Sequence, residues 1–439
     1  MKAKSKVVSA ARIKTTTKQK IAAFSTFLSA SIFSPLSISS GLTINEQSAS
    51  AGGTAYSGRS SSAIDASTVY GNPAGMTKLK SRQVVGGFSV IDAKNKISNV
   101  ETSASGTSNG ESIPLTAVPF AFYAQPYNDR VWLGLGSYVS AGIVNDYESS
   151  FQGRYWGSYS NIRVLTLQPT IAFKLNDKLS FGFGPTINRI DGKLQNYLAT
   201  GPFNNGKETR LSLSGDDTAL GYNAGIIYEL TNAATIGLTY HSQVNYHLKG
   251  KLKISGAPDT FDINRSYDTK LDQVYPEAVD ASITYRFSPK WTGYLGTTWA
   301  NWSKLKSLDF HNDTPDTALG QGLAETSEPL HWKDVWSFAV GASYQIDNKW
   351  QLRAGFAYDP SPAHNDYKSV RMPTGNRKAY TIGAGYSLSE DITIDFAYGY
   401  VKESETSVLQ ENMNDLQPSY SAKFNNDGNV LATQLTYKF

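Results

Sequence analysis

The chain has 439 residues, no Cys, 18% charged residues and 12% aromatic residues, with 37 Gly and 26 Tyr. The charged share lies below the roughly 25% of ordinary soluble domains, and the lack of Cys excludes a disulfide framework. Removing residues 1–39 takes away seven basic residues and leaves 34 Lys and Arg against 37 Asp and Glu, so the basic charge belongs to that segment and a nucleic-acid partner is excluded.

Residues 1–39 have the composition of an export signal. Seven basic residues between Lys2 and Lys20 precede an apolar stretch from Ile21 to Ile38. Pro35 and several serines make this stretch too short and too polar for a membrane-spanning helix. We therefore expect residues 1–39 to be a signal peptide. No later stretch offers eighteen consecutive apolar residues, which excludes a helical membrane protein.

Residues 40–80 are rich in Gly, Ala and Ser and show no alternation of apolar and polar positions. Asp65-Ala66-Ser67 and Asn72-Pro73-Ala74 are typical starts of short helices. We expect this segment either to hang free or to fold into the body of the protein as a plug.

From residue 81 onwards, about fourteen stretches alternate with period two. Residues 391–400 are the clearest case: one face is apolar and aromatic, whereas the other carries Thr393, Asp395, Ala397 and Gly399. A soluble sandwich would place Lys and Glu on its outward face. An apolar outer face around a polar interior is instead typical of a barrel in a membrane.

The connections between these stretches fall into two alternating classes. Six are tight polar turns, centred near residues 128, 177, 231, 289, 348 and 390. Seven are longer, at roughly 92–113, 147–160, 197–217, 256–273, 311–327, 360–375 and 404–424. Short periplasmic turns and long outer loops alternate in this way in outer-membrane barrels. The sequence predicts an all-β, transmembrane antiparallel barrel of about 14 strands in residues 81–439, with both ends in the periplasm.

Segments 41–50 (GLTINEQSAS), 52–58 (GGTAYSG) and 65–76 (DASTVYGNPAGM) resemble the N-terminal hatch of the FadL-type transporters of long-chain fatty acids and hydrocarbons. The resemblance implies a 14-stranded outer-membrane barrel plugged by residues 40–80. It also implies passive uptake of a hydrophobic substrate, with lateral release through a kink in the third strand, and a monomer. The alternative is a general porin or an adhesin that binds through its loops.

The resemblance also implies residue roles. The kink corresponds to Ser140–Val144, with Gly142 at the bend, and the hatch motif Asn72, Pro73 and Ala74 would help to gate it. Gly142 alone would fit an ordinary packing glycine. For a carboxylate headgroup, Lys333 matches a basic residue of the family, and strand alternation places both Lys333 and Arg377 inward. An alternative is that Asp334 or Asp359 pairs with these two charges, or that water solvates them.

A family arginine falls on Asn196, with Arg189 nearby. This departure leaves the choice between a fatty acid and an uncharged hydrocarbon open.

The sequence gives no support for metal binding, dinucleotide binding or nucleophilic catalysis. The five His residues lack metal-ligand spacing, the Gly-x-Gly pairs lack a following helix, and no nucleophile elbow is present. We therefore expect no enzyme activity, no metal and no cofactor. The expected partners are a hydrophobic small molecule, outer-membrane lipid and lipopolysaccharide. Leu435, Tyr437 and Phe439 in the last stretch resemble a signal for the barrel assembly machinery.

Overall fold

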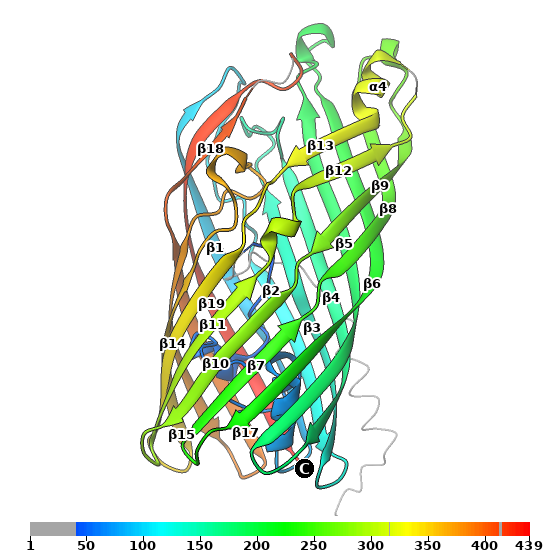
Figure 1. The fold of residues 1–439 in the computed structure, drawn as a ribbon. Coiled ribbons are helices and arrows are strands. Elements are labelled where there is room, and N and C mark those ends of the chain that lie inside the picture. The colour runs from blue at the N-terminus through cyan, green and yellow to red at the C-terminus, as the bar shows by residue number, and fades with distance from the viewer. Residues whose placement is uncertain (1–40, 316, 412–414) are drawn as a thin grey trace, which may run out of the picture. The chain divides into compact units, whose positions relative to one another are not determined.

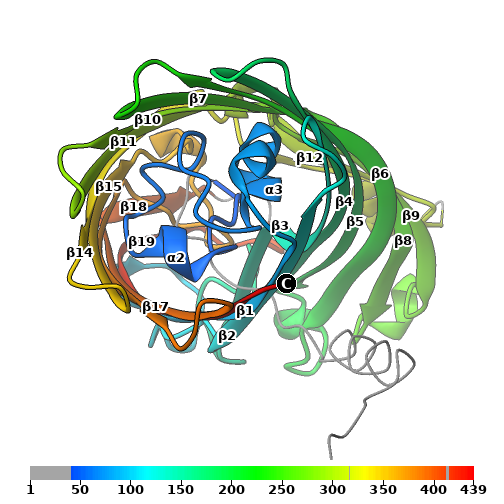
Figure 2. The ribbon, with the colours of Figure 1, turned by 90° about the horizontal axis from the view of Figure 1, so that it is seen from below.

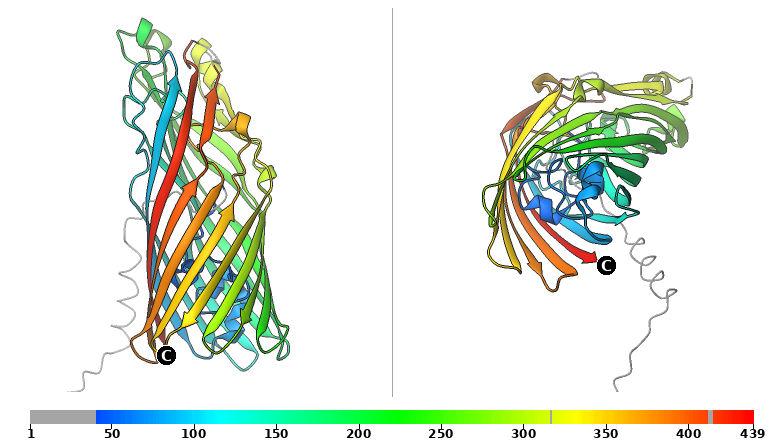
Figure 3. Two further views of the ribbon diagram at one scale, coloured as in Figure 1. Left: turned by 90° about the vertical axis from the view of Figure 1, so that its left-hand side faces the viewer. Right: turned by 60° about the horizontal axis from the view of Figure 1, so that its bottom comes forward.

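The computed structural model describes residues 41–315, 317–411 and 415–439. The predicted signal peptide therefore lies outside the described residues. Strands form a tilted antiparallel barrel wall around the first described segment (Figure 1), and Figure 3 shows the same tilted strands from two further sides.

The sheet is closed. Its first strand, β1 (Gln83–Glu101), pairs with its last, β19 (Tyr420–Lys438), from Gln83–Lys438 to Glu101–Ser421. The described strands between them are β2 (Thr116–Pro126), β3 (Val131–Asp146), β4 (Tyr159–Lys174), β5 (Leu179–Leu198), β6 (Thr209–Glu229), β7 (Ala234–His241), β8 (Val244–Ser255), β9 (Ser266–Tyr275), β10 (Ala278–Arg286), β11 (Trp291–Ala300), β12 (Ser307–Asn312), β13 (Glu325–Pro329), β14 (Val335–Gln345), β15 (Trp350–Asp359), β16 (Arg377–Ser387), β17 (Ile392–Glu403) and β18 (Thr406–Gln410).

Five barrel strands are interrupted and appear as two segments each: β7 with β8, β9 with β10, β11 with β12, β13 with β14, and β17 with β18. The 19 described segments therefore make a barrel of 14 strands. This closed antiparallel barrel of 14 strands confirms the predicted fold class.

The side-chain alternation is also confirmed. On β17, Phe396, Tyr398 and Tyr400 are exposed, whereas Asp395 and Ala397 are buried on the lumen side. On β6, Leu220 is 74% exposed and faces outward. Large apolar side chains exposed on one face only are expected where that face meets lipid.

The six predicted tight turns share one local device. The side-chain oxygen at the start of each turn accepts hydrogen bonds from the backbone N–H groups two and three residues later. The six accepting residues are Asn128, Asn176, Thr231, Ser288, Asp347 and Ser389. Short polar side chains can satisfy turn N–H groups locally, which is why the sequence located these turns.

The predicted bounds of several long connections were wrong. β1 continues to Glu101, and the connection placed at 197–217 is largely strand, because β5 ends at Leu198 and β6 starts at Thr209. Beyond the lipid, the outward positions carry charges such as Lys94 and Lys96. The backbone ladder continues there, but the apolar contrast that marked the strands is lost.

We call residues 41–80 the hatch. Its short helices α2 (Ala49–Gly52), α3 (Thr68–Gly71) and η2 (Pro73–Lys78) lie within the barrel (Figure 2). The Asn72 side chain caps η2 by accepting from the Ala74 N–H at 3.0 Å, as the Asn-Pro-Ala sequence predicts. The outer connections contain η3 (Gly201–Phe203), η4 (Asp259–Phe261), α4 (Ala318–Ala324) and η6 (Asn365–Tyr367), and η5 (Trp302–Lys304) lies in the interruption between β11 and β12. Among the described residues, no helix is long and apolar enough to cross a bilayer.

Two lumen-facing glycines show how closely the hatch approaches the wall. A Cβ atom at Gly225 would lie 2.0 Å from Asn72 Oδ1, and one at Gly237 would lie 1.8 Å from the carbonyl oxygen of Ser60. Any larger residue at either position would collide with the hatch.

Candidate functional site

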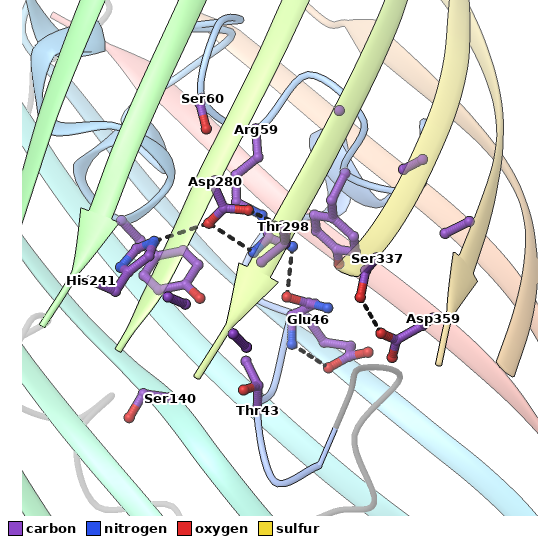
Figure 4. Close-up of a pocket in the computed structure, with 18 of the residues that line it drawn as sticks. Thr43, Glu46, Arg59, Ser60, Ser140, His241, Asp280, Thr298, Ser337 and Asp359 are labelled. Carbon is purple, nitrogen blue, oxygen red and sulfur yellow. Dashed lines mark hydrogen bonds and ion pairs between the residues drawn. The ribbon is translucent and has the colours of Figure 1, made fainter. Parts of the chain in front are cut away.

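A cavity of about 160 Å³ lies between the hatch and the inner wall of the barrel (Figure 4). The hatch contributes Thr43, Tyr56, Arg59 and Tyr70 to its lining. The wall contributes mainly hydroxyl, amide and small apolar side chains, including Tyr138, Ser140, Thr166, Asn188, Asn223, His241, Tyr275, Asp280 and Ala300. The cavity is therefore amphipathic.

Arg59 is the hatch cation in this cavity. Its Nη2 atom donates to Asn45 Oδ1 at 2.6 Å, and its Nη1 atom lies 3.6 Å from Asp280 Oδ2. The guanidinium carbon lies 5.4 Å from the ring centre of Tyr56 and 5.9 Å from that of Tyr70. The Nε atom of Arg59 has no hydrogen-bond partner within the described part of the chain. One donor of a buried cation thus remains available beside the cavity.

Asp280 connects the hatch to three wall strands. It accepts from Thr298 Oγ1, and its Oδ2 atom lies 3.1 Å from His241 Nε2. The other ring nitrogen of His241 lies 2.9 Å from Asn223 Oδ1. Arg59 and Asp280 carry opposite charges side by side, so each largely offsets the charge of the other.

The barrel wall is irregular beside the cavity. The ladder between β2 and β3 ends at the pair Phe120–Tyr138. On the other edge of β3, the register with β4 shifts between Val139 and Ala141, which leaves Ser140 as an extra residue. The predicted bend thus contains a bulge two residues before Gly142.

The hatch takes the place of β2 at this bend. The Ile44 N–H donates to the Ser140 carbonyl at 3.0 Å, and the Gly142 N–H donates to the Leu42 carbonyl at 2.9 Å. Thr43 and Ala141 face each other as an isolated antiparallel bridge. At the bend, β3 is therefore paired with β4 on one side and with the hatch on the other.

Asn72, Pro73 and Ala74 lie against another part of the wall. Asn72 Nδ2 donates to the carbonyl oxygens of Ser60 at 2.7 Å and of Ile226 on β6 at 3.0 Å. A Cβ atom on Gly182 of β5 would lie 2.3 Å from Ala74 N. The hatch segment that is hydrogen-bonded to the bend is Leu42–Ile44 rather than this motif.

A cluster of buried apolar side chains continues from the cavity toward the outer connections. It shares Val244, Tyr246 and Ala300 with the cavity lining and includes Leu42 of the hatch. Trp302 and Trp332 pack edge to face within it, with ring centres 4.9 Å apart. We call the whole cluster, which includes Leu42, Val244, Tyr246, Ala300, Trp302 and Trp332, the apolar cluster. A hydrophobic molecule in this region would contact side chains that are already shielded from water.

The comparison with known families identifies the protein class. Residues 30–439 match the family described as outer membrane protein transport protein (OMPP1/FadL/TodX). The chain belongs to this family. FadL-family proteins are outer-membrane transporters of hydrophobic compounds, and this chain is accordingly an outer-membrane barrel of that class.

Curated relatives align with most of the length of this FadL-family chain. It is 29% identical over 394 residues to the long-chain fatty acid transport protein of Escherichia coli O6:H1, covering 83% of this chain and 87% of that protein. It is 26% identical over 400 residues to outer membrane protein P1 of Haemophilus influenzae, covering 81% and 84%.

Solved structures of FadL-family proteins share the fold. A Pseudomonas aeruginosa FadL homologue superposes with a TM-score of 0.81 at 23% identity, covering 91% of this chain and 100% of that one. The Ralstonia pickettii toluene transporter TbuX superposes with a TM-score of 0.62 at 18% identity, covering 87% and 95%.

The two inward basic residues suggested with the FadL resemblance, Arg377 and Lys333, lie in different environments. Arg377 is buried, as its strand position predicted, but its Nε atom donates to Glu403 Oε1 at 2.6 Å. Lys333 is exposed and lies in an irregular segment before β14, so strand alternation does not extend to it. Neither residue lines the cavity.

Arg189 and Asn196 also lie outside the cavity lining. Arg189 is exposed on the outward face of β5, where its Nη2 atom lies 2.7 Å from Asp216. Asn196 Nδ2 donates to the carbonyl of Tyr155 at 3.3 Å. Arg189 thus contacts the neighbouring strand β6, and Asn196 contacts the connection that precedes β4.

Sequence reasoning missed Arg59 and Asp280. Asp280 follows the alternation of β10 together with Ser282, so its inward direction was available from the pattern. Nothing in the sequence indicated that Arg59 would meet it, because the two residues are 221 positions apart.

Proposed function

We propose that this protein takes up long-chain fatty acids or other hydrophobic compounds passively and releases them sideways through the wall between β2 and β3. The observation that carries this proposal is the interrupted ladder: beyond Phe120–Tyr138, the free edge of β3 is covered by hatch residues Leu42–Ile44. A route through a complete ladder would require many backbone hydrogen bonds to break at once.

The apolar cluster supports the first part of the path. Transfer of apolar surface from water into such surroundings is favourable by about 25 cal/mol per Å². A compound that enters from the outer connections would be drawn toward the cavity, which shares Val244 and Tyr246 with the cluster. No energy source is needed for this movement.

The bend in β3 supports the second part of the path, which is the exit through the barrel wall. Ser140 lines the cavity, and its carbonyl accepts the backbone hydrogen bond that the hatch residue Ile44 donates to β3. A shift of Leu42–Ile44 away from β3 would connect the cavity to the outer surface. Gly142 would permit this close backbone approach, while Asn72, Pro73 and Ala74 would anchor the rest of the hatch to β5 and β6.

For an acidic substrate, we propose Lys333 as the headgroup contact. It follows Trp332 of the apolar cluster, is exposed, and has no ion pair among the described residues. Arg377 is less suited to this role because Glu403 already occupies its guanidinium. Arg189 and Asn196 are engaged elsewhere.

The proposal is tested by identifying the compounds that remain bound to detergent-purified protein by mass spectrometry and then measuring palmitate and hexadecanol binding. Lys333→Ala should weaken palmitate about tenfold, which corresponds to about 1.4 kcal/mol, and leave hexadecanol unchanged. Lys349→Ala, in a tight turn at the opposite rim, is the matched control. Equal losses for both ligands would remove the headgroup role of Lys333. Sugar permeation without any bound hydrophobic compound would instead support a general porin.

A further inference from the structure

A row of lysines occupies the outward face of β8. Lys249, Lys251 and Lys253 are exposed at alternate positions, whereas Leu248, Leu252 and Ile254 between and beside them face inward. Lys270 of β9 lies directly opposite Lys249 in the ladder. We call these four lysines the basic patch. β8 and β9 run side by side near the upper right of Figure 1.

The basic patch is only partly neutralised by the protein. Lys251 pairs with Asp268 at 2.7 Å. Asp216, the neighbour of Lys249 on β6, is bound to Arg189 at 2.7 Å. Among the described residues, no ion pair involves Lys249, Lys253 or Lys270. Two like charges directly opposite each other destabilise a sheet, because their Cβ atoms lie only about 5 Å apart. An anion between Lys249 and Lys270 would remove this repulsion.

The patch lies just outside the apolar belt. On β6, Leu220 is the outermost large apolar side chain that faces lipid, and Asp216, which pairs with Lys249, lies four residues farther out. Four residues of strand span about 13 Å, and the strand tilt makes the height smaller. Lys249 and Lys270 therefore lie at the depth of the lipid headgroups of the outer leaflet, above Leu220 and Ile187, and Lys251 and Lys253 continue the row farther out.

We propose that the basic patch binds the phosphorylated sugar headgroup of lipopolysaccharide, whose acyl chains then lie along the belt at Leu220 and Ile187. The lysine ammonium groups supply point charges for phosphate oxygens. The neighbouring apolar belt selects an amphiphile over a free anion. This interaction is independent of the transported substrate, since the patch faces away from the lumen.

Native mass spectrometry of the full protein in detergent tests this assignment. The probes are a short-chain lipopolysaccharide, the same molecule after removal of its phosphates, and inorganic phosphate. The triple variant Lys249→Gln, Lys253→Gln, Lys270→Gln should bind the phosphorylated lipopolysaccharide at least tenfold more weakly. The control variant Lys178→Gln, Lys290→Gln, Lys349→Gln removes three exposed lysines from the tight turns at the other rim and should bind it normally.

Thermal unfolding gives a second readout. Without lipopolysaccharide, Lys270→Gln should raise the midpoint temperature, because the repulsion with Lys249 is gone. Added lipopolysaccharide should then raise the midpoint of the wild type by more than that of Lys270→Gln. Equal binding by wild type and triple variant, equal binding of the dephosphorylated probe, or saturation by inorganic phosphate alone would each overturn the assignment.

Discussion

At the scale of single residues, two pairs of opposite charges are buried on the lumen face. Arg377 donates to Glu403 at 2.6 Å, and Arg353 donates to Asp395 at 2.6 Å, with all four side chains at most 7% exposed. Glu403 also accepts from Asn426 Nδ2 at 2.8 Å. Removing one member of such a pair leaves a buried charge without compensation.

Arg377→Ala should therefore lower the free energy of unfolding by about 3–5 kcal/mol, because Glu403 would lose its main partner. The double variant Arg377→Met, Glu403→Leu should recover most of that loss. Urea titration of the protein in detergent measures both effects. If Arg377→Ala were nearly neutral for stability but abolished palmitate binding, Arg377 would be a ligand contact and not part of the wall.

Alternation along a strand predicted the direction of these side chains but not their partners. It placed Arg377 inward correctly, because the residue begins β16. It failed for Lys333, because β14 begins only at Val335 and the preceding backbone is irregular. The partner of Arg377 depends on the register between β16 and β17, which brings it opposite Glu403. A register is a property of two strands and cannot be obtained from one.

At the scale of elements, the contact between the hatch and β3 is the feature that decides the proposed exit route. It includes the bridge Thr43–Ala141, two backbone hydrogen bonds, and a hydrogen bond from Gln47 Nε2 to the Val139 carbonyl at 2.9 Å. The sequence predicted a bend near Gly142, yet it could not show that Leu42–Ile44 would complete the ladder there.

Thr43→Cys combined with Ala141→Cys should form a disulfide across this contact, because opposed residues in an antiparallel pair have suitable Cα separations. The protein has no other Cys, so the crosslink would be unique. Uptake of labelled palmitate should fall at least tenfold under oxidising conditions and recover on reduction. Each single-Cys variant serves as a control, and undiminished uptake by the crosslinked protein would exclude movement of this contact during transport.

At the scale of the whole molecule, the hatch fills a barrel that closes without it. β1 pairs with β19 along its length, so the cylinder closes through strand pairing, and hatch residues Leu42–Ile44 complete the wall only at the bend of β3. The hatch rests on glycines of the inner wall, such as Gly225 and Gly237. Its removal would leave a space lined by small residues.

Deletion of residues 41–80 should therefore leave a folded barrel that leaks small polar solutes. Leakage is measured by swelling of proteoliposomes in sugars of increasing size. Retention of the folded barrel is measured by electrophoresis of unheated samples in detergent, in which a folded barrel resists unfolding. Unchanged leakage from a folded deletion variant would mean that other segments close the lumen.

The sequence by itself determined the alternation of the strands, their tight turns and the count of 14, since each is encoded by residues close together in the chain. It also indicated the family through the hatch motifs, and the family match extends over residues 30–439. The tertiary structure alone decided that Arg59 meets Asp280, that Glu403 neutralises Arg377, and that Leu42–Ile44 covers the edge of β3. These contacts join separate segments, and only the folded barrel fixes the positions from which their side chains and backbone groups meet.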